Sequence, residues 1–458
     1  MTDTRAEGVT VVGSSRDRHF RFGDDSGVDW IVILIPTVIG MRGLNAQVSL
    51  LFTLLLTIAA FVRNTDSRYR VSFGPLAVLV AASAVVLGRP SPGTPTVAAA
   101  FPIVTLLIVV ALVARIASTV DGRRIAVSLA NGAGLYCFAN IALYTVGIRG
   151  VMSTARLGGL VEASGLSRTL YPLATSINTA PLLAAVFATS LPFVIARGNR
   201  LRAALQLLFF TSAVMLLATT RSTLATVSTV SLLAIVIGFP SSTRWLSQST
   251  ALIAIPSVAI VPAVLNSTYM PVGLIQMLVP GRSISSESLG SIQGRSRIWS
   301  GSTQYWGEWV DVPQKILGFG KDGHYRSGAS FTYADLIRHL TRSSYLSTMH
   351  NSYLQQLFDG GLIGFALLAV AILWASVRLA RRPVDWGNPG VSAVLMMTVL
   401  LLGSITEVAL SPGPGSELFW ILVVLVGIAS QMSERRNPTK MGADRPSATP
   451  SDLRGSFG

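Results

Sequence analysis

Charge is scarce in this sequence. Only 12% of its 458 residues are Asp, Glu, Lys or Arg, whereas soluble globular domains carry roughly 25%. Half of the residues are hydrophobic, and the mean hydropathy is +0.56. The hydrophobic residues come in runs close to the roughly 20 residues that cross a bilayer as a helix. A soluble globular fold is therefore excluded, and we expect an all-α polytopic membrane protein.

Cysteine is almost absent as well. The single cysteine, Cys137, lies inside an apolar run, and one thiol excludes an intrachain disulfide. The sequence also lacks a cluster of His, Cys, Asp and Glu with metal-ligand spacing, a phosphate-binding loop and a dinucleotide fingerprint. We therefore expect neither a metal nor another cofactor.

The two ends of the chain lack apolar runs. Residues 1–27 have neither the apolar core nor the cleavage site of a signal peptide, and their polar composition predicts a disordered cytoplasmic tail. Residues 433–458 predict a second tail. Residues 28–268 and 351–432 are apolar, and residues 269–350 form a long polar stretch between them, called here the polar segment. We expect twelve membrane spans, nine before this segment and three after it, near residues 28–43, 44–62, 73–89, 97–115, 125–147, 172–195, 203–219, 222–239, 250–268, 351–377, 391–410 and 416–432.

Arginine is unevenly distributed among the predicted loops. Alternate loops are rich in it and contain Arg63, Arg68, Arg70, Arg115, Arg123, Arg124, Arg197, Arg200, Arg202, Arg244, Arg378, Arg381 and Arg382. The short loops between them are poorer and contain Arg42, Arg89, Arg149, Arg156, Arg168 and Arg221. Because basic loops stay on the cytoplasmic side, we expect both termini in the cytoplasm and the polar segment outside. The same rule explains the net charge of +15, so nucleic acid is not an expected partner.

Two amphipathic patterns occur in the polar segment. Trp299, Trp306 and Trp309 recur near helical spacing, with Tyr305 beside them, which predicts a helix lying in the membrane interface. A second short helix is predicted by an apolar stripe of Phe331, Ala334, Ile337 and Leu340. We expect both helices to cap the outer face of the bundle, with a mildly cationic surface that suits anionic lipid headgroups.

Three arginines are candidates for binding an anion. Arg221 lies between two apolar runs with almost no room for a loop, and a guanidinium at membrane depth costs at least about 2.5 kcal/mol unless it finds a partner. It either snorkels to lipid phosphates or binds phosphate oxygens through paired hydrogen bonds. Arg295 and Arg297, close to Trp299, are either solvated loop residues or anion ligands.

His350 is the candidate general base. It lies where the polar segment meets the tenth span, and imidazole is the side chain that changes charge near neutral pH. The alternative is an ordinary polar cap at the membrane interface. His324 and His339 lack a comparable position, and Glu407, near the outer end of the eleventh span, is a weaker candidate. Close helix packing near the start of the tenth span is predicted by Gly360, Gly361 and Gly364.

These motifs occur in the order of a known family. An arginine opens the eighth span, and it is followed by Gly294-Arg295-x-x-x-Trp299, Gly318-Phe319-Gly320 and His350-Asn351-x-Tyr353-Leu354. In this the chain resembles the O-antigen ligase and O-antigen polymerase superfamily of bacterial envelope glycosyltransferases. The sequence-specific part of the resemblance covers residues 218–223 and 294–364. Thr220-Arg221-Ser222 departs from the Ser-Arg-Gly that is common in the family.

The resemblance implies metal-independent, inverting glycosyl transfer from a polyprenyl-diphosphate-linked glycan. The acceptor would be a hydroxyl on a glycan, lipid or protein, at the outer face of the bacterial cytoplasmic membrane. The resemblance assigns catalytic roles to Arg221, Arg295 and His350, with Arg297 as a further ligand of the diphosphate. A chain-length regulator or a flippase would be a natural partner. The sequence does not separate a polymerase from a ligase, which differ in the acceptor.

Two other classes of membrane protein fit the composition. A transporter or flippase for lipid-linked oligosaccharide is also commonly built from twelve spans, but the repeat symmetry and broken helices of transporters are not clear in this sequence. Another class of membrane glycosyltransferase uses an acidic pair in its first outer loop. That loop is here only Arg42-Gly43-Leu44-Asn45, which argues against it.

Overall fold

A computed structural model describes residues 46–63, 67, 69–90, 94–148, 171–174, 176, 178–196, 199–220, 223–258, 298–333, 349–412 and 416–432. These residues are mostly helical and contain no named strand; their one extended pairing is an isolated bridge between Val71 and Gln431. The predicted all-α class is therefore confirmed for the part of the chain that the structure describes.

The helices follow the apolar runs of the sequence. Before the polar segment they are α2 (Ala46–Arg63), α3 (Gly74–Leu87), α4 (Thr96–Thr119), α5 (Gly122–Thr145), α7 (Thr179–Val194), α8 (Arg200–Thr220), α9 (Thr223–Gly238), η2 (Pro240–Arg244) and α10 (Leu246–Ala254). Within and after it they are α14 (Val312–Leu317), α15 (Gly323–Arg326), η3 (Ala329–Thr332), α17 (Ser352–Leu379), α18 (Arg382–Trp386), α19 (Asn388–Thr406) and α20 (Glu417–Ser430). Residues 298–308 are also helical.

Five of the described helical stretches are long and apolar enough to cross a membrane: Ala99–Thr119, Gly122–Thr145, Arg200–Thr220, Ser352–Trp386 and Asn388–Thr406. Four shorter apolar helices, α3, α7, α9 and α20, accompany them. The predicted span 28–43 and both predicted tails lie outside the described residues. The chain is thus a membrane protein with several spanning helices, and the number twelve stays a prediction.

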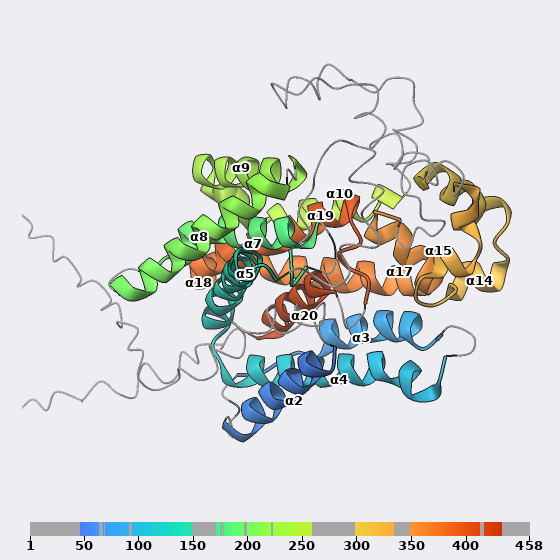
Figure 1. The fold of residues 1–458 in the computed structure, drawn as a ribbon, viewed down its shortest axis with the longest axis horizontal. Coiled ribbons are helices and arrows are strands. Elements are labelled where there is room, and N and C mark those ends of the chain that lie inside the picture. Colours follow the sequence, from blue (N-terminus) through green and yellow to red (C-terminus); the bar gives the residue numbers. More distant parts are fainter. Residues whose placement is uncertain are drawn as a thin grey trace, which may run out of the picture.

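The arginine-rich loops meet at one end of the bundle, called here the basic end. Arg123 donates to the carbonyl oxygen of Asp385 at 2.7 Å, and the N–H of Met432 donates to the carbonyl oxygen of Arg70 at 2.9 Å. The first contact joins the start of α5 to α18, which follows α17, and the second joins the loop before α3 to the chain just after α20. Figure 1 shows α3, α4 and α17 lying roughly along the long axis of the molecule, so that α17 carries its first residues away from the basic end.

The described part of the polar segment has a small hydrophobic core of its own. It comprises Ile298, Trp299, Ala329, Tyr333, Met349, Leu354 and Phe358. Two of these, Leu354 and Phe358, belong to the first turns of α17, so the segment is packed onto that helix. Figure 1 shows α14 and α15 beside this end of α17.

The tryptophans of helix 298–308 divide between protein and surface. Trp299 is buried, and the ring of Trp306 lies 5.0 Å from that of Phe358, measured between centroids. Trp309 alone of the three is exposed. The predicted helix is therefore present, and of the three rings two pack against the protein. Its location in the membrane interface stays a prediction. The second predicted stripe lies almost wholly outside the described residues.

A pair of glycines joins the polar segment to α17. Gly318 has φ 73° and ψ −173°, and Gly361, inside α17, has φ 65° and ψ −166°. This region of backbone conformation is essentially restricted to glycine. A β-carbon on Gly361 would lie 2.4 Å from both the nitrogen of Gly318 and the carbonyl oxygen of Ile316. The kink in α17 and the end of α14 therefore fit together only because both residues lack a side chain.

Candidate active site

His350 immediately precedes the cap of α17. Its φ of 51° places a non-glycine residue in the left-handed region, which costs an L-residue about 1–2 kcal/mol. The next residue, Asn351, caps the helix, because its side-chain oxygen accepts from the N–H groups of Tyr353 and Leu354, both at 2.9 Å. The cap fixes where the helix begins and so fixes where the histidine projects.

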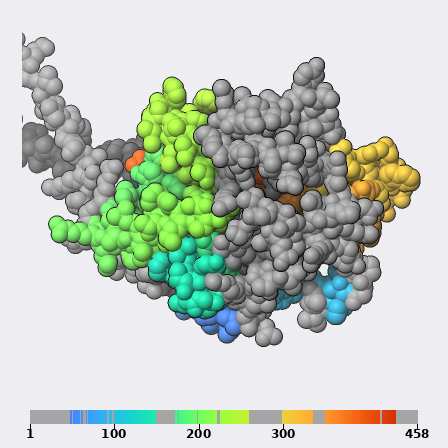
Figure 2. Space-filling model, turned by 45° about the horizontal axis from the view of Figure 1, so that its top comes forward, coloured from blue at the N-terminus to red at the C-terminus, as the bar shows by residue number. Residues whose placement is uncertain are grey.

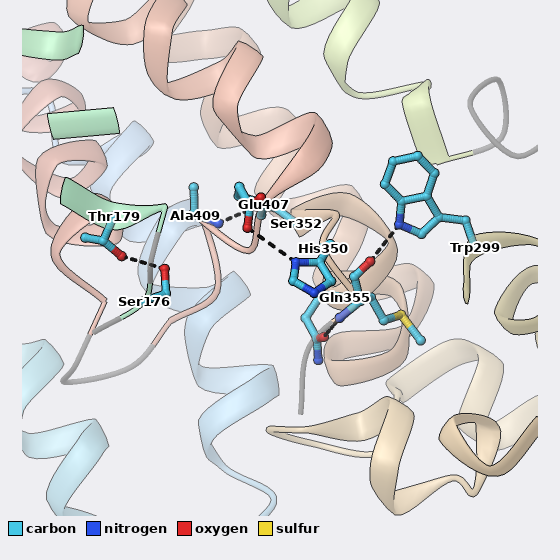
Figure 3. Close-up of polar contacts among 9 residues, drawn as sticks. Ser176, Thr179, Trp299, His350, Ser352, Gln355, Glu407 and Ala409 are labelled. Carbon is cyan, nitrogen blue, oxygen red and sulfur yellow. Dashed lines mark hydrogen bonds and ion pairs between the residues drawn. The ribbon is translucent and has the colours of Figure 1, made fainter. Parts of the chain in front are cut away.

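Met349, on the other side of His350, is held at both of its backbone polar groups. Its carbonyl oxygen accepts from the indole nitrogen Nε1 of Trp299 at 2.6 Å, and its N–H donates to Oε1 of Gln355 at 3.3 Å. Figure 3 shows the indole of Trp299 directed at this carbonyl, beside His350. The left-handed turn at His350 is therefore held by hydrogen bonds on both flanks.

Glu407 faces the histidine from the end of α19. Its Oε2 lies 3.4 Å from Nδ1 of His350, and the two side chains are 13% and 29% exposed respectively. A carboxylate only accepts hydrogen bonds, so this contact favours the tautomer with the proton on Nδ1, in which Nε2 can accept a proton. Catalytic hydrogen bonds are often long before substrate binds. Both side chains are thus partly exposed. Figure 3 shows them directed at one another.

Ser352 fixes the backbone that carries Glu407. Its hydroxyl donates to the carbonyl oxygen of Glu407 at 2.7 Å and accepts from the N–H groups of Ala409 and Leu410, at 2.7 and 3.1 Å. The first turn of α17 thus holds both members of the pair, His350 directly and Glu407 through the loop after α19.

A buried polar network lies behind this turn. Gln355 donates to Oδ1 of Asp359 at 2.7 Å, and the same oxygen accepts from the N–H of Gly323 at 2.7 Å. Nε2 of Gln355 also lies 3.2 Å from Nδ1 of His324, which is fully buried. In the sequence, His324 has no position comparable to that of His350. In the structure it belongs to the buried scaffold that supports the candidate site. Nothing in a lone histidine within a polar stretch signals this.

Burial also affects a phenol of this region. Tyr333 is buried in the core of the polar segment, and burial raises the pKa of its hydroxyl above the ordinary value. A tyrosine is neutral at pH 7, and burial favours this form further. Tyr333 therefore supports the position of the helix 298–308 by packing and does not contribute a base.

The three candidate arginines lie outside the described residues. Arg221 falls between the end of α8 at Thr220 and the start of α9 at Thr223. Arg295 and Arg297 precede helix 298–308. The structure describes the residues next to them: the hydroxyl of Thr219 lies 2.6 Å from that of Tyr171, and Trp299 contacts Met349. Whether the arginines converge on His350 stays a prediction.

The described geometry suits proton transfer. A partly exposed imidazole with one nitrogen paired to a carboxylate has its second nitrogen available for an acceptor hydroxyl. Among the described residues no group of His, Cys, Asp and Glu could hold a metal ion.

Part of the chain is similar to a known family. Residues 206–369 match the family model described as O-antigen ligase. This confirms the resemblance to the O-antigen ligase and O-antigen polymerase superfamily, and the matched region contains Arg221, Arg295, Arg297 and His350. The family indicates a membrane glycosyltransferase of the ligase or polymerase type in envelope polysaccharide synthesis, with lipid-linked glycan and acceptor as substrates. No curated protein was found to match the chain.

Proposed function

We propose that this protein polymerises or ligates envelope polysaccharide by transferring a glycan from a polyprenyl diphosphate to an acceptor hydroxyl. The observation that carries the proposal is the His350–Glu407 pair at 3.4 Å. His350 lies just before α17, inside the region matched by the O-antigen ligase family, and Glu407 reaches it from the end of α19, beyond that region. In this reaction the acceptor oxygen attacks the anomeric carbon as the bond to the diphosphate breaks, with inversion.

His350 is the general base of the proposed reaction. Nε2 takes the proton of the acceptor hydroxyl, and the imidazolium that forms is stabilised by the Glu407 carboxylate at Nδ1. Glu407 acts through His350 and is a positioning residue. The backbone hydrogen bonds of Met349 and the hydroxyl hydrogen bonds of Ser352 hold the two side chains in place, which reduces the reorganisation needed during transfer.

The arginines of the polar segment and of the α8–α9 connection serve the leaving group. A departing diphosphate gains negative charge, and fixed guanidinium groups stabilise that charge without a metal ion. Arg221 and Arg295 are assigned this role, with Arg297 as a further ligand. The donor arrives already activated on its lipid, so no nucleotide site is required.

The proposed site faces the outside of the cytoplasmic membrane. The support is the arginine distribution: the described loops that are rich in arginine gather at the basic end, and α17 carries its first turn away from it. With the positive-inside rule, both termini are cytoplasmic. A flippase that supplies the lipid-linked donor and a regulator of chain length are expected partners.

The arginine roles are tested by Arg221→Ala and Arg295→Ala. Each variant should reduce glycan extension or transfer by about 100-fold or more, because removing one preorganised charge-stabilising group costs about 3–4 kcal/mol in comparable sites. The measurement is the polymer length and amount of envelope glycan in cells that carry equal levels of inserted protein. Arg244→Ala, in a predicted cytoplasmic loop, is the control. Wild-type glycan from both variants would refute the diphosphate assignment.

Trp299 should act as a positioning residue for His350. Trp299→Phe retains most of the ring but removes the donor to the buried carbonyl of Met349, and an unsatisfied buried acceptor costs about 1–3 kcal/mol. We expect kcat to fall about tenfold while KM for the acceptor changes little, in an assay with purified protein and lipid-linked donor. Trp309→Phe, which changes an exposed residue just beyond the end of the same helix, should leave both constants unchanged. Equal effects of the two variants would contradict the role.

A further inference from the structure

Helix α14 presents an apolar surface that no described residue covers. Val312 and Ile316, four residues apart and so on one face of the helix, are 67% and 41% exposed, and the neighbouring Trp309 is 71% exposed. The one cation of α14, Lys315, is turned back onto the protein, where its Nζ donates to the carbonyl oxygen of Gly307 at 2.9 Å. Figure 2 shows the surface of this segment, in gold, projecting at one end of the molecule. Exposed apolar surface of this kind marks an interaction site.

The environment of α17 changes at the point where α14 contacts it. From Ser352 to Gly361 the helix is buried on nearly all sides, with Leu357 partly buried. From Leu362 onward, an exposed apolar stripe runs along it, made of Leu362, Ile363, Ala366, Val370, Trp374 and Val377. Such a stripe on a spanning helix faces lipid, so the protein-covered part of α17 ends, and its lipid-facing part begins, at Gly361.

The length of the lipid-facing part agrees with this boundary. At about 1.5 Å per residue, the stretch from Leu362 to Leu379 is about 27 Å long, close to the hydrocarbon thickness of about 30 Å. Its far end carries Arg378, which donates to the hydroxyl of Ser72 at the basic end. One membrane boundary therefore lies at the basic end and the other at the kink of α17.

A second helix marks the same level. Helix α3 ends at Leu87, and the guanidinium of Arg89 just beyond it donates to the carbonyl oxygen of Gly318 at 2.7 Å. Arg326 donates in turn to the carbonyl oxygens of Arg89 and Pro90, at 2.7 and 3.2 Å. Two guanidinium groups thus lie where α14 meets the bundle. Arginine at this position is typical of the headgroup layer, where anionic lipid phosphates are available.

We infer that α14, with Trp309, is an interfacial anchor whose exposed face lies in the headgroup and upper acyl region of the bilayer. The backbone of α14 meets α17 at the residue where the lipid-facing stripe begins, because the carbonyl oxygen of Ile316 lies against Gly361. A tryptophan at the edge of such a face is typical of membrane interfaces. The anchor holds the polar segment down on the membrane beside the lipid-embedded helices. This inference does not depend on the proposed catalytic roles.

Spin labels on single cysteines test the anchor in the full-length protein. The native Cys137 is fully buried, so a cysteine introduced at Val312, at Ile316 or at Trp309 is the one that reacts. The protein is reconstituted in vesicles of phosphatidylethanolamine and phosphatidylglycerol, and each label is probed with molecular oxygen, which concentrates in lipid, and with a water-soluble nickel chelate. Gln304→Cys is the matched control, because Gln304 is an exposed polar residue of the same segment.

The expected result is an oxygen-to-nickel accessibility ratio several-fold higher at positions 312 and 316 than at position 304. A ratio equal to that of position 304 would place α14 in water and overturn the inference. Shielding from both reagents would also overturn it, because a protein partner or a second copy of the chain would then cover the face. Position 309 gives a third reading if one variant does not reconstitute.

Discussion

His350→Asn and His350→Ala should each lower glycan transfer by at least about 100-fold, the usual contribution of a general base. The asparagine variant is the sharper test. His350 has a left-handed φ of 51°, and asparagine tolerates this conformation better than other non-glycine residues. His350→Asn therefore preserves the turn before α17 but removes the base. The measurement is transfer by purified protein from a lipid-linked donor.

Glu407→Gln tests, in the same assay, whether Glu407 positions His350 and stabilises its charge. The amide retains an oxygen that can accept from Nδ1 of His350 but loses the charge that stabilises the imidazolium, so an intermediate loss is expected. Glu308→Gln removes an exposed carboxylate from the polar segment and should have no effect. If His350→Asn inserts normally and transfers glycan at the wild-type rate, the general-base role is wrong.

Gly361→Ala should have the largest effect on stability. Alanine would have to adopt φ 65° and ψ −166°, which costs a non-glycine residue about 1–3 kcal/mol. Its β-carbon would also lie 2.4 Å from the nitrogen of Gly318, and because the obstacle is backbone, α14 would have to move away from α17. We expect a loss of well over about 2 kcal/mol, seen as a lower thermal midpoint of the purified protein and as reduced yield.

Gly318→Ala should behave in the same way, since its β-carbon would lie 2.4 Å from the carbonyl oxygen of Asp359. Gly307→Ala is the matched control within the polar segment. Gly307 is part of helix 298–308, and nothing lies within 4 Å of a β-carbon built on it. Alanine is favoured over glycine in a helix by about 1 kcal/mol, so this variant should be neutral or slightly stabilising. Equal midpoints for Gly361→Ala and Gly307→Ala would contradict the proposed joint.

The helical class and the course of the apolar runs could be predicted from sequence, because composition and run length set them directly. The O-antigen ligase resemblance could also be predicted, since it depends on short motifs in a fixed order. The pairing of His350 with Glu407 could not. Both residues were named as candidates, but they are 57 residues apart in the sequence. The packing of α19 against α17 brings them together, and no local pattern encodes that packing.

The tryptophans show a second limit of sequence analysis. Helical spacing of Trp299, Trp306 and Trp309 correctly predicts a helix, yet spacing does not say which face meets protein and which meets lipid. Trp299 is instead a buried donor to Met349. The glycines show the same limit. The sequence predicts close packing at Gly361, but it does not predict that the residue packed against it is Gly318.

The fit between Gly318 and Gly361 also has a consequence for the order in which the chain is made. The polar segment leaves the ribosome before α17, yet the surface on which it folds is α17 itself. On the proposed topology the segment therefore crosses the membrane before α17 is available, and its described part can pack only after α17 has been inserted. Glu407 emerges later still, at the end of α19. Until that helix is synthesised, the His350–Glu407 pair cannot form, so this part of the site is completed late in synthesis.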